Sequence, residues 1–223
     1  MIYVDKLRVR NAVILVTLSL LFTHCSPVKE IKTNVPNYKL VQIGRSKNPT
    51  VLFFQDSYCL QNDSITNWFV KNNYQVILAE RLNIDPLYIL NTDHPLMRAS
   101  DGLALINSLS NYPIEYIAAT GLEVHSTVEW FVNTEIKGGF LFPFYKGSLR
   151  DYLIECLYKN KKVLPGYPSI IEPIELVQLL ETTPPPSGIY GNYSLRFLQD
   201  IWQQQPKINL TSYEGELLYQ VVK

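Results

Sequence analysis

The chain has 223 residues, a length that suits one domain or at most two. Its hydrophobic content of 47% and charged content of 18% allow a sizeable core and exclude wholesale disorder. The 20 basic and 20 acidic side chains balance, and no basic block is interleaved with aromatics, which argues against a nucleic-acid partner.

The N-terminus has the features of a signal peptide. Three basic residues precede an apolar run over 12–22 that is too short to span a bilayer. Cys25 follows this run and leads into polar sequence, which resembles a bacterial lipoprotein signal in which the cysteine is lipidated. His24 departs from the small residue expected before that cysteine, so ordinary secretion or an uncleaved anchor stays open. The sequence predicts a signal peptide over 1–24, a lipid anchor at Cys25 and a membrane-anchored protein of the cell envelope.

Two further cysteines, Cys59 and Cys156, lie in separate predicted elements. An exported chain could pair them in a disulfide, and two such cysteines can equally stay unpaired and buried. The three histidines are scattered, without a C-x-x-C or H-x-x-x-H spacing. The sequence predicts neither a metal site nor a cofactor.

A polar stretch over 25–48 is predicted to be a tether, with one weak apolar run at 38–43 that could form an edge strand. Beyond it, β-branched and aromatic runs predict strands at 50–55, 74–79, 115–120 and 138–143. Capped amphipathic segments predict helices that begin near Asn62, at Ser100 or Asp101, and after Gly121. This alternation predicts an α/β fold with a doubly wound, mostly parallel sheet and helices on both faces.

The character of the chain then changes to helices. Ser148 is predicted to cap a helix with an apolar stripe over 149–157, and Pro173 to open a second helix. Apolar residues at 198–202 mark a third helix, and 215–222 (GELLYQVV) is predicted to be a last strand. Residues 147–205 are therefore expected to form a helical cap over one end of the sheet.

This layout resembles the α/β-hydrolase family over residues 49–223. Residues 50–57 (TVLFFQDS) are similar to the family's strand and oxyanion loop, with Gln55, Asp56 and Ser57 at the loop positions. Arg81, after the next strand, matches an arginine common there, and 190–205 is similar to a cap helix of esterase- and peptidase-like members. A flavodoxin-like doubly wound fold is the alternative. The resemblance implies a hydrolase with a small-molecule or peptide ligand.

The motif that carries the family's chemistry is G-x-S-x-G, a sharp strand-to-helix turn that exposes a serine. With Gly121 as its first glycine, Glu123 occupies the nucleophile position. With Ala119 first, Gly121 occupies it instead. Ser126 is nearby, but it falls on the first helical turn, where a packing role is the plainer interpretation. Gly121, Glu123 and Ser126 are the candidates for the elbow, and none is a convincing nucleophile.

The family places its acid after the strand that resembles 215–222, and its histidine after one more strand, whereas this sequence stops at Lys223. Two functions stay open. One is an exported hydrolase that is shortened or altered, and the other is a non-catalytic binding or scaffold lipoprotein of the same fold. In either case we expect no serine-hydrolase turnover from the sequence as given, and we expect the last strand to be an exposed sheet edge.

Overall fold

A computed structural model of the protein describes residues 28–35, 37–57, 59, 62–82, 95–127, 136–143, 145, 147–159, 173–182, 188–190, 193–202, 211–213 and 218–222. The strands are β1 (Val28–Ile31), β2 (Tyr38–Ile43), β3 (Thr50–Gln55), β4 (Gln75–Arg81), β5 (Ile114–Thr120), β6 (Gly138–Phe142), β7 (Ile189–Tyr190), β8 (Tyr193–Ser194), β9 (Thr211–Tyr213) and β10 (Leu218–Val222). The helices are α2 (Asn62–Lys71), α4 (Pro95–Ser108), α6 (Leu149–Tyr158), α7 (Pro173–Glu181) and α8 (Leu195–Asp200), with a 3-10 turn, η1, at Gly121–Glu123.

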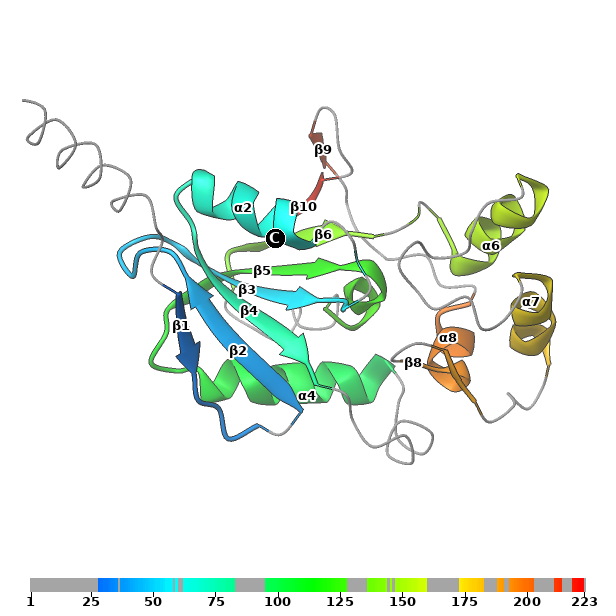
Figure 1. Ribbon diagram of the computed structural model, residues 1–223, viewed down its shortest axis with the longest axis horizontal. Coiled ribbons are helices and arrows are strands. Elements are labelled where there is room, and N and C mark those ends of the chain that lie inside the picture. The colour runs from blue at the N-terminus through cyan, green and yellow to red at the C-terminus, as the bar shows by residue number, and fades with distance from the viewer. Residues whose placement is uncertain are drawn as a thin grey trace, which may run out of the picture.

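An eight-stranded sheet runs in the order β1-β2-β4-β3-β5-β6-β10-β9. Its four central strands, β4, β3, β5 and β6, are parallel, with Val51 opposite Val76 and Ala119 opposite Leu141. The outer strands pair antiparallel on both sides of this centre. Helix α2 lies on one face of the sheet and α4 on the other (Figure 1). The predicted α/β fold, with a parallel centre and helices on both faces, is confirmed.

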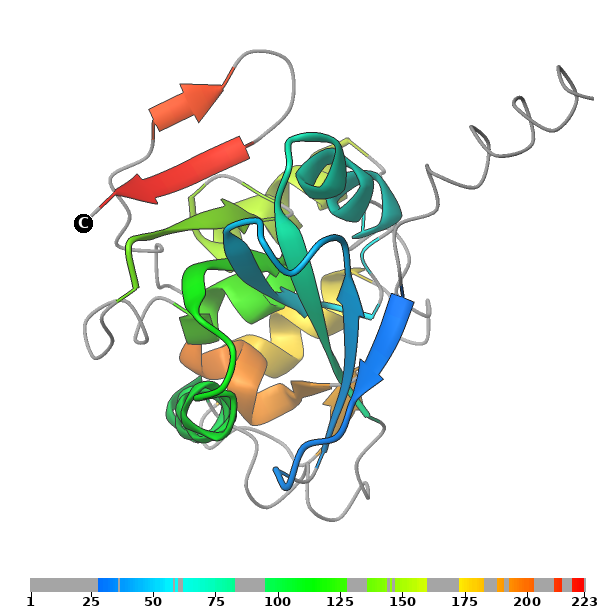
Figure 2. The ribbon, with the colours of Figure 1, turned by 90° about the vertical axis from the view of Figure 1, so that its left-hand side faces the viewer.

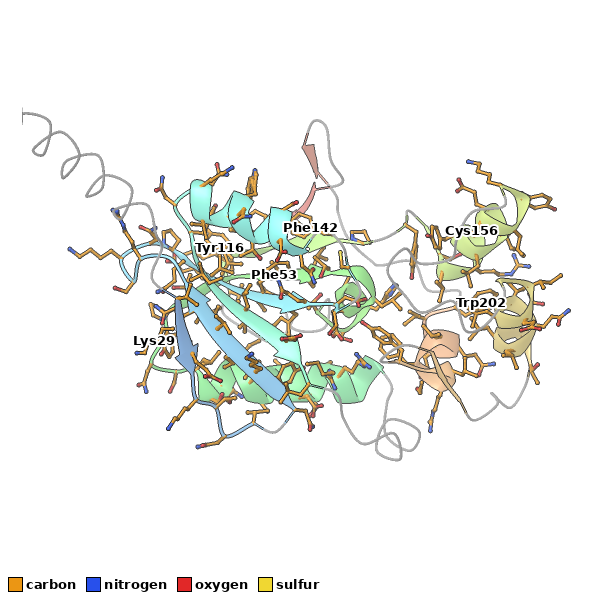
Figure 3. All side chains as sticks on the ribbon, in the orientation of Figure 1. Lys29, Phe53, Tyr116, Phe142, Cys156 and Trp202 are labelled. Atoms are coloured by element: carbon orange, nitrogen blue, oxygen red, sulfur yellow. The ribbon has the colours of Figure 1, made fainter. Side chains whose placement is uncertain are left out.

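The middle residues of the central strands are apolar on both faces, because both faces of the sheet are covered. Successive side chains of a strand point to opposite faces, so β3 divides between two cores. Phe53 packs under α2 with Phe69 and Phe140, while its neighbours in sequence, Leu52 and Phe54, belong to the core under α4. Figure 3 labels Phe53, Tyr116 and Phe142, which all belong to the α2 side.

Three expectations about boundaries and edges are wrong. The predicted tether over 25–48 contributes β1 and β2, and the expected edge strand at 38–43 is not an edge, because β2 pairs with β1 on one side and with β4 on the other. Buried Tyr38 and Leu40 alternate with exposed Lys39 and give β2 one buried face. Helix α4 begins at Pro95 rather than at Ser100 or Asp101, since proline suits the first turn of a helix. Strand β10 is not an edge, because it pairs with β6 on one side and with β9 on the other (Figure 2).

Helices α6, α7 and α8 lie beyond the carboxyl ends of the central strands (Figure 1). They share a hydrophobic cluster that includes Cys156 and Trp202 (Figure 3), with Leu122 contributed from η1. The predicted cap of α6 is present, since Ser148 Oγ accepts a hydrogen bond from the Asp151 N–H at 3.1 Å. Cys156 and Cys59 are both buried, and no disulfide joins them.

Candidate functional site

The carboxyl ends of β3 and β5 lie side by side, and open α/β sheets bind ligands outside the carboxyl ends of their strands. Phe54 pairs with Ala119, so Thr120, the next residue of β5, lies beside the chain where it leaves β3 at Gln55 and Asp56. The Asp56 N–H donates to Thr120 Oγ1 at 3.0 Å, and Thr120 Oγ1 donates to Asn62 Oδ1 at 2.8 Å. Asn62 Nδ2 completes the ring by donating to the Asp56 carbonyl at 2.8 Å. These bonds fix the loop after β3 against the end of β5.

The turn after β5 is sharp. Thr120 is extended, with φ −116 and ψ 158, and Gly121 then has φ +59, in the left-handed region that favours glycine. The chain continues through η1 into helical residues up to Thr127, where the described segment ends. This is the strand–turn–helix geometry of a nucleophile elbow. Of the two registers of the motif, the one that begins at Ala119 fits this geometry. It puts Gly121, the residue with the left-handed backbone, at the nucleophile position.

The Asp56 carboxylate lies against this turn. Asp56 Oδ2 accepts a hydrogen bond from the Leu122 N–H at 3.0 Å and another from the Tyr193 hydroxyl at 3.0 Å. Asp56 and Tyr193 are buried, with exposed fractions of 2% and 1%. In serine hydrolases with such an elbow, the N–H of the residue after the nucleophile forms part of the oxyanion hole. Here a carboxylate of the protein itself accepts the equivalent N–H.

Glu123, the second elbow candidate, forms a buried ion pair. Arg98 Nη1 is 2.5 Å from Glu123 Oε1, which also accepts from the Tyr193 hydroxyl at 3.3 Å. The Arg98 guanidinium lies over the rings of Tyr193 and Phe197, 4.2 and 4.7 Å from their centres. Buried charges persist in proteins when they are paired and hydrogen-bonded. Glu123 is therefore a partner of Arg98, and Tyr193 links this pair to Asp56.

His125 and Ser126 follow the elbow, but no hydrogen bond joins their side chains. His125 Nε2 lies 2.8 Å from the Tyr145 hydroxyl, and burial lowers the pKa of His125 to about 4, so the imidazole is neutral at pH 7. Burial also raises the pKa of Tyr145. Ser126 Oγ is fully buried and has no hydrogen-bond partner among the described residues. No described base thus activates Ser126.

The other predicted site residues lie apart from the elbow. Gln55 Nε2 donates to Thr66 Oγ1 at 3.3 Å, and Ser57 is exposed in the turn after β3. Arg81 is buried at the end of β4, where it donates to the Tyr38 hydroxyl at 3.0 Å and lies 3.5 Å from Asp101. Burial raises the pKa of Tyr38 to about 12, against the opposing influence of Arg81. Cys25 lies outside the described residues.

Arg98 and Tyr193 are central to the site, and neither was predicted to belong to it. A signal for Arg98 existed, because it lies seven residues before Leu105 on the buried side of α4, four residues before the buried Gly102. A charged residue in line with an apolar helix face is a candidate for a buried, paired charge. Tyr193 has no comparable local signal, because its partners lie 70 and 137 residues away.

An open groove of about 570 Å³ lies along β1 and β2, but none of the elbow residues lines it. Within the described ranges, no three His, Cys, Asp or Glu side chains are grouped so that they could hold a metal ion. None of the described helices has the length and hydropathy that crossing a bilayer requires.

Comparisons with known proteins found no matching family model and no matching curated protein. Similar solved structures include a laboratory-evolved variant of potato epoxide hydrolase (16% identity, TM-score 0.40, 59% of this chain and 46% of that one). A membrane phospholipase A titled as a bacterial virulence factor matches at 16% identity and TM-score 0.46, over 85% of this chain and 62% of that one. A proline iminopeptidase-related protein from Thermus thermophilus matches at 15% identity and TM-score 0.37, over 54% and 46%.

The chain thus spans less than two thirds of each of these three structures. Likeness at this level bears on neither activity nor substrate. The function of a fold depends on the residues of its site, which here are those around the chain's own elbow.

Proposed function

We propose that this chain is the α/β-hydrolase-like domain of an exported lipoprotein, and that it acts in the bacterial cell envelope as a binding or scaffold module without hydrolysing its ligand. One observation carries the proposal. Gly121 occupies the left-handed position of the elbow, where a serine hydrolase has its nucleophile. The N–H of the next residue, Leu122, donates a hydrogen bond to the Asp56 carboxylate. A fold does not bring its relatives' activity with it, so the site decides.

Acyl transfer needs an activated nucleophile, and the elbow residues supply none. Gly121 has no side chain. A hydroxyl at its free pKa is a weak nucleophile unless a base accepts its proton, and Ser126 Oγ has no such partner among the described residues. His125 is neutral but engaged with Tyr145. Loss of triad members typically lowers rates by several powers of ten.

The surroundings of the elbow also oppose the reaction. An oxyanion is stabilised by donors aimed at the position where negative charge develops. At this turn the Leu122 N–H already donates to a carboxylate, and an oxyanion beside Asp56 would meet a like charge. Both the missing nucleophile and the occupied donor favour a binding role over catalysis.

The test is activity-based labelling of the purified chain with a fluorophosphonate probe, together with turnover of p-nitrophenyl acetate. We expect no labelling and no turnover above that of a heat-denatured sample. Ser126→Ala and Ser57→Ala serve as matched variants that should behave as the wild type. Stoichiometric labelling of the wild type that is lost in either variant would restore the enzyme interpretation.

A shortened or altered serine hydrolase is the second candidate, because the strand–turn–helix after β5 retains the elbow geometry. This candidate requires an acid and a histidine beyond residue 223. Reading the gene downstream of Lys223 tests it directly. A continuing frame with an aspartate and then a histidine would favour this candidate.

The lipid anchor is tested by Cys25→Ala. Cys25 follows the apolar run of the signal and precedes polar sequence, as the lipidated cysteine of a lipoprotein does. We expect the variant to leave the membrane fraction, while Cys156→Ala, which removes a buried cysteine of α6, stays membrane-bound. A processed Cys25→Ala protein that remains in the membrane fraction would contradict the anchor.

A further inference from the structure

We propose that the end of the sheet opposite the elbow is a docking face for the anionic phospholipid headgroups of the bilayer that holds the lipid anchor. This role rests on the proposed function, because it takes Cys25 to be the anchor. The amino-end face, as we call this surface, is formed by segments that precede or begin the strands, namely residues 28–29, 44–49, 71–74, 111–115 and 136–137.

Strand pairing brings these segments together at one end of the sheet. Thr50, the first residue of β3, lies opposite Gln75 of β4 and Ile114 of β5. Strand β6 begins beside the start of β5 as well. On the antiparallel side, Val28 begins β1 opposite Ile43, where β2 ends. Figure 2 looks onto this end of the molecule, away from the cap helices.

The exposed charges of the amino-end face are mostly basic. Its basic side chains outside any described ion pair come from three elements of the chain, and all are exposed: Lys29, Arg45, Lys47 and Lys71. Among the described residues of the face, Glu115 is the one acid, and Lys137 Nζ lies 2.5 Å from its Oε2. The face therefore keeps a clear positive charge after its own ion pair is formed.

The charge differs between the two ends of the strands. Exposed Asp63 and Glu80 lie toward the carboxyl ends, at the start of α2 and near the end of β4. On β1, Glu30 follows Lys29 and lowers the positive charge of that edge by one. An anionic bilayer surface attracts nearby basic side chains and repels acidic ones. This distribution favours the orientation in which the amino-end face meets the bilayer.

The anchor lies directly beside this face. Only Ser26 and Pro27 separate Cys25 from Val28. Three peptide units of about 3.8 Å allow at most about 11 Å between the Cα atoms of Cys25 and Val28. At physiological ionic strength charges act over about 8–10 Å, so a lipid on Cys25 holds the basic side chains near that range of the headgroups. One anchor and one basic patch are the two signals that stable membrane attachment requires.

Docking by the amino-end face turns the elbow away from the bilayer. Strand β3 runs from Thr50 on this face to Gln55, just before Asp56 at the elbow. Figure 3 labels Lys29 at the end of the molecule opposite Cys156 of the cap. A ligand of the proposed binding module therefore reaches the elbow from the aqueous side, which favours a water-soluble ligand over a lipid in the bilayer.

The experiment places a fluorophore on one introduced cysteine of the full chain, reconstitutes the protein into vesicles, and measures quenching by lipids that have a quencher on the headgroup. Ser46→Cys labels the amino-end face and Ser57→Cys the elbow end of the same strand, and both serines are exposed. Cys59 and Cys156 are buried, and the chain without an introduced cysteine gives the background labelling.

We expect the label at Ser46 to be quenched several-fold more strongly than the label at Ser57 in vesicles of phosphatidylcholine with phosphatidylglycerol. The difference should shrink in pure phosphatidylcholine, and also at about 1 M salt, where charges act over only about 3 Å. Lys29→Gln with Lys71→Gln should lower the ratio of docked to undocked protein by about 30-fold, since each basic side chain near an anionic surface contributes about fivefold.

The matched control is Lys159→Gln with Arg196→Gln, which removes the same charge from exposed positions at α6 and α8 and should leave the quenching unchanged. Equal quenching of the two labels in anionic vesicles would overturn the inference and would assign the basic face to a soluble acidic partner. Quenching that responds neither to salt nor to the loss of Lys29 and Lys71 would overturn it as well.

Failure of the anchor gives a different result. The chain would then not sediment with vesicles of pure phosphatidylcholine, which offer the basic face no net charge. Sedimentation with anionic vesicles would still test the face in that case. Binding that salt and the Lys29→Gln, Lys71→Gln variant weaken would support the docking face without the anchor, and no binding would overturn it.

Discussion

Replacing Arg98 by methionine should destabilise the protein strongly, because Arg98 balances a buried charge. The side chains of Arg98 and Glu123 are 2% and 6% exposed, with 2.5 Å between Nη1 and Oε1. Removing one partner of a buried pair costs about 3–5 kcal/mol. The lost contact of the guanidinium with the rings of Tyr193 and Phe197 can add about 2 kcal/mol, part of which the methionine side chain restores. A loss of about 3–5 kcal/mol corresponds to a fall in melting temperature of about 6–20 °C for a chain of this size.

The assay is urea unfolding followed by tryptophan fluorescence, where a stability change moves the midpoint at constant slope. Arg150→Met is the matched control, because Arg150 pairs with Glu181 at 3.6 Å while both side chains are about half exposed. Such surface pairs contribute at most about 1 kcal/mol. The double variant Arg98→Met with Glu123→Leu should be more stable than Arg98→Met alone, because no lone buried charge remains. Equal losses from Arg98→Met and Arg150→Met would refute the reasoning.

Three further predictions concern the elbow. Gly121→Ala should cost about 1–3 kcal/mol in urea unfolding, since φ +59 strains any side chain; an unchanged midpoint would mean that the turn relaxes. Ser126→Ala should leave the melting temperature unchanged or raise it, because its buried hydroxyl has no described partner to lose, and a marked fall would reveal one. The folded pKa of His125, about 4, lies below its ordinary value of 6.5, so the unfolded chain binds more protons between these values and stability falls as pH drops through them. His125→Gln should remove a slope of about 1.4 kcal/mol per pH unit in that window, and identical pH profiles for variant and wild type would contradict a buried neutral imidazole.

The central strands and their helices could be predicted from the sequence because their signals are local. Parallel strands covered on both faces are apolar at every position, as in Val51 to Phe54, and such runs stand out without knowledge of their partners. Ser148 likewise predicts the start of α6, because the side chain of a helix cap accepts a hydrogen bond from an N–H only three residues away. The beginning of α4 was missed for a local reason as well, since Arg98 interrupts the apolar face that marks a helix.

Edges and pairings depended on the tertiary structure. Strand β2 has the sequence of a weak apolar run, and only its antiparallel pairing with β1 on one side and β4 on the other puts it inside the sheet. The sequence of β10 predicts a strand. Its antiparallel pairing with β6 and with β9 depends on the path of the chain outside β10 itself. The local periodicity of a sequence predicts that a segment is a strand, whereas the strand that it pairs with depends on residues far away in the sequence.

The candidate site shows the same division. The sequence alone placed a strand, a sharp turn and a helix around Gly121, and it showed that no serine stands on the elbow. It could not show what fills the turn, because the Leu122 N–H meets a carboxylate 66 residues earlier and Tyr193 reaches that carboxylate across 137 residues. Contacts at such separations leave no periodic trace, since periodicity reports only which face a side chain occupies. Only the tertiary structure brings the Asp56 carboxylate to the elbow, where it accepts the hydrogen bond of the Leu122 N–H.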